Sequence, residues 1–409
     1  MFNEAYCRDT SIKVRSQLEI KRQRGDFIGS FAVFGYKKDP SDHHKLITDE
    51  FAANVVRDIF HWKLNGIGII EIANRLNAQG IPTPLEYKTQ QGMKYNTPFR
   101  VKSESVWSAK MVLRILQNPV YIGTLEQGRV TTPSYKVKRL INKPREEWAV
   151  IENCHEAIID SFDFDTIQKV LSLDTHTGVP GQAVDKFGGM AYCGECGAPM
   201  VRKTIPSGKR KYVYYVCSAH KTHKTCYSHS LRDSVLDEIV LESVREHIKE
   251  VVGLSEMLGL IDMARLQQVS MRKLQERLNK KRDEVDYYQK LVRSLYENLA
   301  AQIIDREEYL DLKTTYTKKR EDAEAQAKVI EQQIEGETEL YTNTGWMAQF
   351  KAHKSISALD RAVVVTLIEH ILIYREHRVE IVFRWENEFR LLLDMVTQAQ
   401  HLFPGEEAV

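Results

Sequence analysis

Residues 191–230 read AYCGECGAPMVRKTIPSGKRKYVYYVCSAHKTHKTCYSHS. This stretch contains four of the six cysteines in the chain: Cys193, Cys196, Cys217 and Cys226. A C-x-x-C turn lets two sulfurs face one metal ion, and the tyrosine-rich run at 212–216 predicts a hairpin strand that delivers the third cysteine. We therefore predict that these four cysteines bind one structural Zn²⁺ in a β-ribbon.

Other interpretations of this cluster remain. A redox C-x-x-C would require a βαβ context, which the surrounding sequence does not offer. His220, His223 and His229 lie close to the second cysteine pair, so the fourth ligand is open between Cys226 and a nearby histidine. A closed site of four ligands leaves no position for a substrate, and it therefore predicts a role in folding instead of hydrolysis.

The composition predicts a multi-domain protein. The chain has 409 residues, of which 43% are hydrophobic, enough for two or three cores. It contains no run of about 18 uncharged apolar residues and no secretory segment, so we expect a cytoplasmic protein without a membrane partner. Clustered cysteines in a reducing compartment favour a metal site over disulfides, and Cys7 and Cys154 are expected to be packing or surface thiols.

Charge is concentrated locally, although the formal net charge is only +2. Residues 128–145 and 200–224 are rich in lysine and arginine and contain no carboxylate. Such segments suit a phosphate backbone, whereas a solvated loop is the plainer interpretation. The predicted DNA contacts are Lys21, Arg22, Arg24, Arg129, Lys136, Lys138, Arg139, Lys209, Arg210 and Lys211.

The first half of the chain predicts a helical domain. A helix over 3–25 ends in a basic turn, and an aromatic, glycine-punctuated stretch at 27–36 is typical of an extended linker. A short glycine turn at 65–68 joins two amphipathic helices, the outline of a helix-turn-helix. We expect Thr48 to cap the first of these helices, Phe51, Val55, Ile59 and Trp62 to face its core, a third helix over 105–117, and a strand over 121–125.

The second half predicts a coiled coil. Apolar residues recur every seven positions from Met271 to Leu299, and a return helix repeats from Tyr309 to Ile330 with a poorer second seam. An antiparallel hairpin is favoured over a dimer along the whole length, because the poor seam would hold a long dimer weakly. We expect a helix over 357–374 and a strand pair over 378–392 to return to the zinc domain.

In this order the motifs resemble those of the large serine recombinases, which include phage integrases and transposon resolvases. The resemblance rests on Ser11 to Arg15, Gly35-Tyr36, the run 80–84 (GIPTP), the run 118–123 (NPVYIG), the cysteines and the heptads. It spans essentially the whole chain, and the ordered combination is more specific than any single motif.

The resemblance implies site-specific DNA recombination through a phosphoserine linkage, with two domains reading one attachment half-site. Family members carry a catalytic domain before this region, and Met1 begins on what resembles the last helix of that domain. Ser11, Ser16 and Ser30 lack the arginine setting of a nucleophile, so we assign no catalytic residue and expect the chain to be inactive alone.

We therefore predict a multi-domain α+β protein with a helix-turn-helix-like recombinase domain, a zinc β-ribbon and an inserted coiled-coil hairpin. Its expected partners are double-stranded DNA, a second copy or a full-length recombinase bound through the coiled coil, and a directionality factor. The alternative is a regulatory protein that inhibits an intact recombinase. The predicted boundaries are a terminal helix 1–25, a recombinase domain 26–170 with its linker 26–40, a zinc ribbon 171–262, a hairpin 263–340 and a returning segment 341–409.

Overall fold

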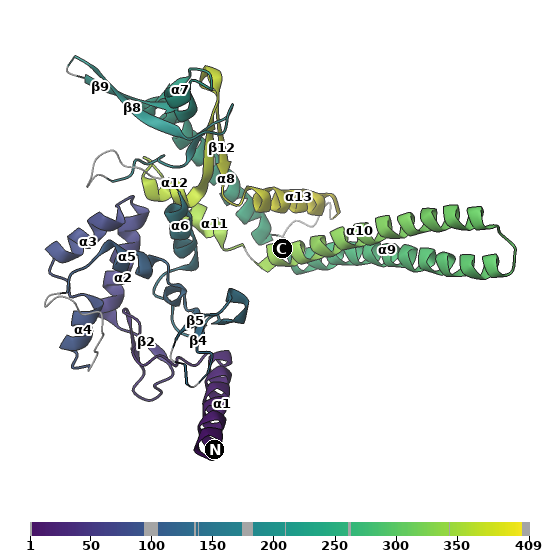
Figure 1. Cartoon of the computed structure of the whole chain (residues 1–409). Coiled ribbons are helices and arrows are strands. Elements are labelled where there is room, and N and C mark those ends of the chain that lie inside the picture. The colour runs from purple at the N-terminus through teal and green to yellow at the C-terminus, as the bar shows by residue number, and fades with distance from the viewer. Residues whose placement is uncertain are drawn as a thin grey trace. The chain divides into compact units, whose positions relative to one another are not determined.

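The computed structural model describes residues 2–93, 105–134, 136–137, 139–173, 183–208, 210–260, 263–342 and 344–402 (Figure 1). The chain forms two compact units, the first made of residues 1–241 and 357–382 and the second of residues 242–356 and 383–409. Within the described residues, no helix is long and apolar enough to cross a membrane.

Helices dominate the first half of the first unit, and short strands connect them. The helices of this unit are α1 (Phe2–Gln23), α2 (Glu50–Leu64), α3 (Ile69–Ala78), α4 (Pro84–Gln90), α5 (Ala109–Leu116), α6 (Ser161–Ser172), α7 (Ser218–His223) and α12 (Arg361–Leu367), with 3-10 turns η1 (Pro119–Ile122), η2 (Arg145–Glu147) and η3 (Arg375–His377). The short strands pair as β1 (Tyr36–Lys38) with β2 (Leu46–Thr48), β3 (Leu125–Gln127) with β6 (Ala149–Ile151), and β4 (Val130–Thr131) with β5 (Ile141–Asn142).

The helical core follows the predicted periodicity, with two corrections at the start of α2. Asp49, not Thr48, caps this helix by accepting a hydrogen bond from the Ala52 amide, because Thr48 is already paired in β2. Phe51 is 48% exposed and stacks on the Tyr87 ring, so it covers α4 instead of the core. The other predicted core positions are represented by Ile59 and Leu116, which are both fully buried.

The expected strand over 121–125 is a 3-10 turn for its first part. The Asn118 side chain accepts a hydrogen bond from the Val120 amide, and Gly123 adopts a φ of 82°, so the chain turns before β3 begins at Leu125. Tyr121 is thereby buried, and its hydroxyl donates to the Phe34 carbonyl at 2.9 Å. The stretch expected to be a surface linker therefore contributes to the domain core.

Two three-stranded sheets build the second half of the first unit. One has the order β12 (Val379–Phe383), β11 (Ile368–Ile373), β7 (Ala191–Cys193), and the other has the order β10 (Ser230–Arg232), β9 (Arg210–Cys217), β8 (Met200–Ser207). β11 pairs parallel with β7, so the chain returns to the ribbon 180 positions after leaving it, from Ala191 to Ile371.

Two expectations for the C-terminal region were wrong in part. The helix expected over 357–374 ends at Leu367, because the apolar run that follows pairs with β7 as strand β11. The strand pair expected over 378–392 is one strand, β12, followed by helix α13 (Glu386–Leu402). α13 has an amphipathic face with buried Phe389, Leu392 and Val396, which explains why a helix forms there.

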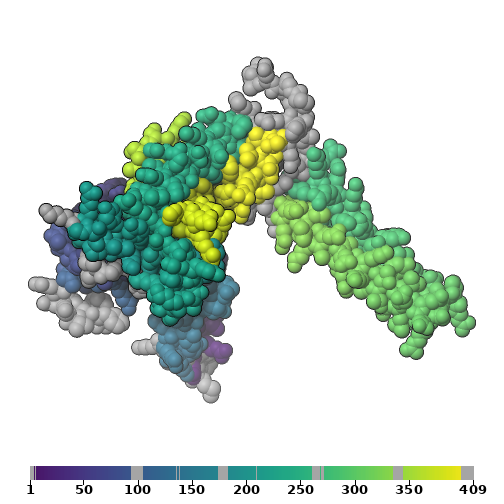
Figure 2. Space-filling view, turned by 90° about the horizontal axis from the view of Figure 1, so that it is seen from above, coloured from purple at the N-terminus to yellow at the C-terminus, as the bar shows by residue number. Residues whose placement is uncertain are grey.

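The second unit contains a long helical hairpin. α8 (Asp233–Leu260) enters it from the first unit, and α9 (Met263–Ala300) and α10 (Arg306–Thr342) then lie side by side in both Figure 1 and Figure 2, where they are green. Leu274 and Leu278 of α9 pack against Ala327 and Ile330 of α10. The short helix α11 (Trp346–Lys351) and α13 complete the unit.

Candidate metal centre and nucleic-acid interface

The four cysteines come from three places in the ribbon. Cys193 ends β7, and a tight knuckle leads to Cys196, in which the Cys193 amide donates to the Ala198 carbonyl and the Gly197 amide donates to the Cys193 carbonyl, both at 2.8 Å. Cys217 ends β9, opposite Met200. Cys226 lies in the loop after α7, where His220 Nδ1 contacts the Cys226 carbonyl at 2.8 Å.

The geometry of the sulfurs fits a tetrahedral ion. The four Sγ atoms all lie within 4.8 Å of one another. The Cys193 and Cys226 sulfurs are 3.8 Å apart, and those of Cys196 and Cys217 are 3.6 Å apart. A zinc–sulfur bond of about 2.3 Å corresponds to a tetrahedral edge of about 3.8 Å. The predicted ligands are thus placed as one Zn²⁺ requires.

The electrostatics of the cluster also call for a cation. Burial raises the pKa of the Cys193 thiol, and burial together with the neighbouring cysteines raises the pKa of Cys226 to about 12. The Ala198 backbone amide lowers the pKa of Cys196. Four adjacent thiolates repel one another, and a bound divalent ion removes that cost.

The histidines occupy supporting positions near the cysteines. His229 Nε2 lies 3.4 Å from the Cys193 sulfur, and its Nδ1 contacts the Tyr227 carbonyl at 3.1 Å. Among the described residues, the set of ligand atoms that converge here consists of the four cysteines. The geometry therefore favours Cys226 over a histidine as the fourth ligand.

The hairpin of β8 and β9 extends from the metal centre and carries exposed cations. Its register pairs Met200 with Cys217 next to the cluster and Ser207 with Arg210 at the far end. Arg210 and Lys211 are exposed there, whereas Lys209 lies outside the described residues. This end of the hairpin is thus a basic surface supported by the metal site.

Several predicted DNA contacts are engaged within the chain. The Lys21 ammonium lies 3.0 Å from His44 Nε2, and Arg22 pairs with Glu19 at 2.9 Å. Arg24 and Arg139 are exposed, and Lys138 lies outside the described residues. Two further predicted contacts also form ion pairs. Arg129 pairs with the Glu126 carboxylate at 2.5 Å, and Lys136 pairs with the Glu4 carboxylate.

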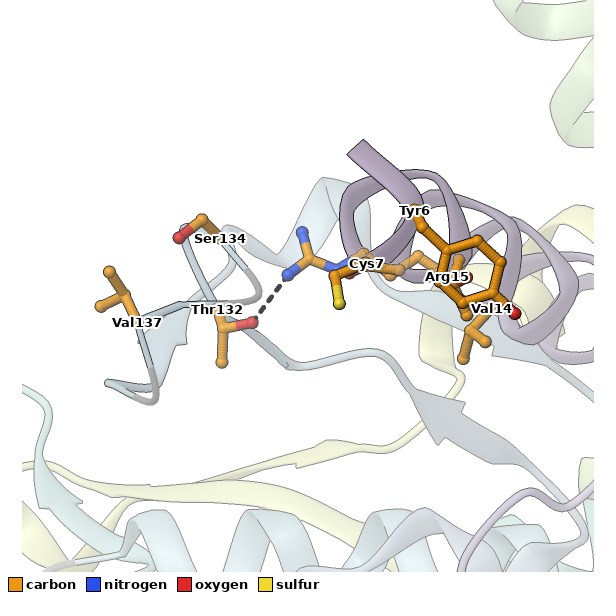
Figure 3. Close-up of a pocket in the computed structure, with 9 residues that line it drawn as sticks. Tyr6, Cys7, Val14, Arg15, Thr132, Ser134 and Val137 are labelled. Atoms are coloured by element: carbon orange, nitrogen blue, oxygen red, sulfur yellow. Dashed lines mark hydrogen bonds between the residues drawn. The ribbon is translucent and has the colours of Figure 1, made fainter. Parts of the chain in front are cut away.

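The structure brings α1 and the basic stretch 128–145 together. Arg15 Nη2 donates to the Thr132 hydroxyl at 2.9 Å, beside a cavity of about 510 Å³ that Tyr6 and Val137 help to line (Figure 3). The Arg22 side chain approaches Gly128, with Cδ 3.5 Å from where a Cβ would lie. These two predicted basic segments therefore form one surface.

Sequence reasoning missed a second cationic groove in the helical domain. A cavity of about 740 Å³ lies between α4 and α5, lined by Lys88, Lys110 and Arg114 over an apolar floor that includes Phe34 and Met111. Burial lowers the pKa of Lys88. Lys110 and Arg114 are one helical turn apart on α5, a spacing that could have marked them as a pair.

Two family models match the chain in succession. The family described as Recombinase matches residues 50–173, and the recombinase zinc beta ribbon domain matches residues 186–245. The uncharacterized protein YefB of Bacillus subtilis (strain 168) is 31% identical over 142 residues, which are 34% of this chain and 45% of YefB. The match thus spans less than half the length of that relative.

Two solved structures also resemble parts of the chain at low scores. A crystal structure of an LSR–DNA complex covers 91% of this chain and 99% of its own, with a TM-score of 0.36 and 18% identity. A structure from work on the sequence requirements of the Listeria innocua prophage attP site covers 57% and 86%, with a TM-score of 0.31 and 20% identity. The family models carry the assignment: residues 50–173 match a recombinase domain and residues 186–245 a recombinase zinc ribbon domain, which together support the C-terminal region of a large serine recombinase.

Proposed function

We propose that the chain binds double-stranded DNA sequence-specifically at one half-site of a recombination attachment site, as part of a serine recombinase. One observation carries the proposal. A recombinase domain is followed by a ribbon domain in which the four cysteines converge beside an exposed basic hairpin. The two domains then read adjoining parts of one half-site.

The bound ion has a structural task in this proposal. Zn²⁺ held by Cys193, Cys196, Cys217 and Cys226 would cross-link the knuckle before β8, the end of β9 and the loop after α7. Such a ribbon is too small to bury a large core, so the metal would supply much of its folding free energy. The ion thereby holds the basic hairpin in one orientation.

Phosphate and base contacts are divided among different elements. Arg24, Arg139 and Arg210 present exposed guanidinium groups that suit phosphate oxygens. α3 presents Asn74 and Arg75 on its exposed face, and amide and guanidinium groups can read adenine and guanine in the major groove. We propose that α3 and the basic segments supply the base contacts.

Selection from randomised and genomic DNA with purified, zinc-loaded full chain at two salt concentrations tests the proposal. We expect enrichment of one half-site a few tens of base pairs long. Salt-sensitive binding without any enriched sequence contradicts specific recognition, and so does an absence of binding.

A charge reversal tests the contribution of the ribbon hairpin. Lys209→Glu, Arg210→Glu and Lys211→Glu together should weaken half-site binding and reduce the salt slope by about two to three, since each phosphate contact contributes about 0.9. The matched control reverses three exposed cations of α9, Lys273, Arg277 and Lys280. Equal effects of the two triple variants would contradict the hairpin's role.

A second candidate function is favoured by the end of the helical hairpin. Tyr296, Ile303 and Leu310 are 69%, 71% and 54% exposed around the turn between α9 and α10. We propose that this apolar end binds a second copy of the chain or a full-length recombinase, so that the chain would compete for its sites and assemblies. A directionality factor is a further partner of this surface.

Light scattering of the chain alone and mixed with an intact recombinase tests that candidate. Association should be lost in the double variant Tyr296→Glu, Ile303→Glu and kept in Val329→Glu, which alters an apolar position that is 53% exposed and distant from the turn. Association that survives the double variant contradicts the assignment.

A further inference from the structure

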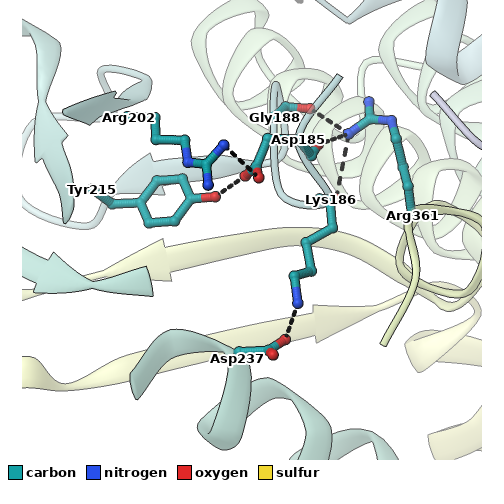
Figure 4. Close-up of polar contacts among 7 residues, drawn as sticks. All are labelled: Asp185, Lys186, Gly188, Arg202, Tyr215, Asp237 and Arg361. Atoms are coloured by element: carbon teal, nitrogen blue, oxygen red, sulfur yellow. Dashed lines mark hydrogen bonds and ion pairs between the residues drawn. The ribbon is translucent and has the colours of Figure 1, made fainter. Parts of the chain in front are cut away.

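Arg361, the first residue of α12, holds a loop of the ribbon domain. Only 4% of Arg361 is exposed, and its Nη1 donates to the carbonyls of Asp185, Gly188 and Lys186 at 2.5, 3.1 and 3.3 Å (Figure 4). Burial lowers the pKa of this guanidinium to about 10, so it remains charged at neutral pH. One buried cation thus fastens a loop to a segment about 175 residues further along the chain.

The same side chain packs against the turn that precedes α3. A Cβ on Gly66 would lie 2.6 Å from Arg361 Cδ and 2.9 Å from the Val184 carbonyl, and Gly66 has a φ of +81°. The Val184 amide donates to the Gly66 carbonyl at 2.8 Å. Only a residue without a side chain allows the turn, the loop and Arg361 to approach this closely.

The loop is connected in turn to the basic hairpin. The Asp185 carboxylate lies 3.2 Å from the Arg202 guanidinium on β8 and accepts a hydrogen bond from the Tyr215 hydroxyl on β9 (Figure 4). The Lys186 ammonium contacts Asp237 of α8 at 2.7 Å. A continuous set of contacts therefore leads from the α2–α3 turn through the loop to the hairpin.

A second fastening supports the first. The Lys169 ammonium on α6 donates to the carbonyls of Ile368 and Glu369, both at 3.0 Å, and pairs with the Glu369 carboxylate at 2.7 Å. α12 and β11, which follow the helical hairpin in sequence, thus contact the recombinase domain at two separate points.

From these contacts we propose that Arg361 is a positioning residue that sets the spacing between the DNA sequences read by the two domains. Gly66 lies in the segment that matches the recombinase model, the 186–188 part of the loop lies in the ribbon match, and Arg361 lies outside both. Two reading surfaces held rigidly bind a half-site of one spacing, because any other spacing takes one surface out of register. This inference rests on the proposed function.

The spacing preference of the full zinc-loaded chain tests the proposal. Half-sites recovered by selection are lengthened or shortened by up to about four base pairs between the sequences bound by the recombinase domain and the ribbon domain. The Kd is measured for each half-site. Insertion of two base pairs rotates one surface by about 70° about the duplex axis and should weaken binding by the wild type at least about tenfold. Binding by Arg361→Met should weaken by less than about threefold over the series, because the released domains adjust independently.

Two further variants make the result specific. Arg361→Lys keeps the charge, but its shorter side chain holds the ammonium back from the place of Nη1, which makes all three contacts, and it should give an intermediate preference. Arg390→Met removes an exposed arginine that pairs with Glu386 on α13, and should behave as the wild type does. Spacing dependence in Arg361→Met equal to that of the wild type overturns the proposal.

Hydrogen exchange at the Val184 amide provides a readout without DNA. Release of the clamp should raise its exchange rate at least about tenfold in Arg361→Met, whereas an unchanged rate overturns the clamp. If Arg361→Met does not fold, Arg361→Lys serves in both measurements. If selection with the wild type enriches no half-site, the proposed function is overturned, and the spacing role with it. If the Val184 exchange rate still rises in Arg361→Met, the clamp itself stands.

Discussion

Two tyrosine hydroxyls attach residues 26–40 to the recombinase domain. The Tyr36 hydroxyl donates to the Glu156 carbonyl at 2.9 Å, and the Tyr121 hydroxyl donates to the Phe34 carbonyl at the same distance. Burial raises the pKa of both phenols, so both remain donors at any physiological pH. These two hydroxyl groups therefore help to make residues 26–40 part of the domain core instead of a free linker.

Removal of one of these hydroxyls should be measurable. Tyr121→Phe leaves the buried Phe34 carbonyl without its donor and should lower the free energy of unfolding by about 1–3 kcal/mol. Hydrogen exchange of the α2 amides measures this change. Tyr296→Phe, at a 69% exposed position, is the control and should change it by less than about 0.5 kcal/mol.

His247 of α8 should make the second unit sensitive to acid. It packs between Phe350, Phe383 and Phe389, and burial lowers its pKa from 6.5, although Glu386 and Glu250 oppose the shift. Because the unfolded histidine binds a proton more readily than the folded one, stability is full above pH 6.5 and falls as the pH drops below it.

Thermal unfolding followed between pH 7.5 and 5.5 checks the effect of His247. His247→Phe should flatten the pH dependence in that window, whereas the exposed His43→Phe should leave it as in the wild type. An unchanged slope in His247→Phe would show that another group causes the acid sensitivity.

At the scale of elements, the α9–α10 hairpin buries few large apolar side chains among its described residues. One buried cluster has Ile334 packed against it, Leu295 is buried nearer the turn, and the capping box of Asp305 and Glu308 starts the return helix. The return helix buries Ala323, Ala327 and Ile330, whereas Gln326, which the seven-residue repeat places on the poorer seam, is exposed. Each large apolar residue of the hairpin therefore contributes a large share of its stability.

Truncation of one such residue should open the hairpin locally. Leu278→Ala removes a side chain that is 3% exposed and should cost about 2–3 kcal/mol, seen as faster hydrogen exchange along α9 and α10. Leu310→Ala makes the same chemical change at a 54% exposed position. Comparable exchange in both variants would show that the cluster does not hold the helices together.

At the scale of the whole molecule, metal and helices should respond separately. A strong chelator should unfold the ribbon and abolish specific DNA binding, while far-UV circular dichroism keeps most of its helical signal, because α9 and α10 contain no metal ligand. Readdition of Zn²⁺ should restore binding. Cys226→Ser should mimic the chelator at lower zinc concentrations, and Cys7→Ser, at an exposed position, should not. Loss of the helical signal together with the ribbon would contradict this independence.

Local signals predicted the parts of the fold that depend on local chemistry. The cysteine spacing predicted a cluster that the structure places within 4.8 Å, and heptads predicted the helical hairpin. The sequence predictions failed where residues distant in the chain determine the local structure. Ile368–Ile373 continues a helical pattern but becomes a strand because β7 offers it an edge. Arg361 carries no motif, and the carbonyls that it meets lie in a remote loop.

The parallel pairing of β7 with β11 has a consequence for biosynthesis. β7, which contains Ala191, cannot pair with β11 until Ile371 has been synthesised, 180 positions later. A ribosome adding about 5–20 residues per second needs about 10–35 s to reach that position. During that interval α9 and α10 are made and can close as a local hairpin, whereas the sheet cannot. All four cysteines emerge early, so we expect a nascent chain to capture its metal before its sheet is complete.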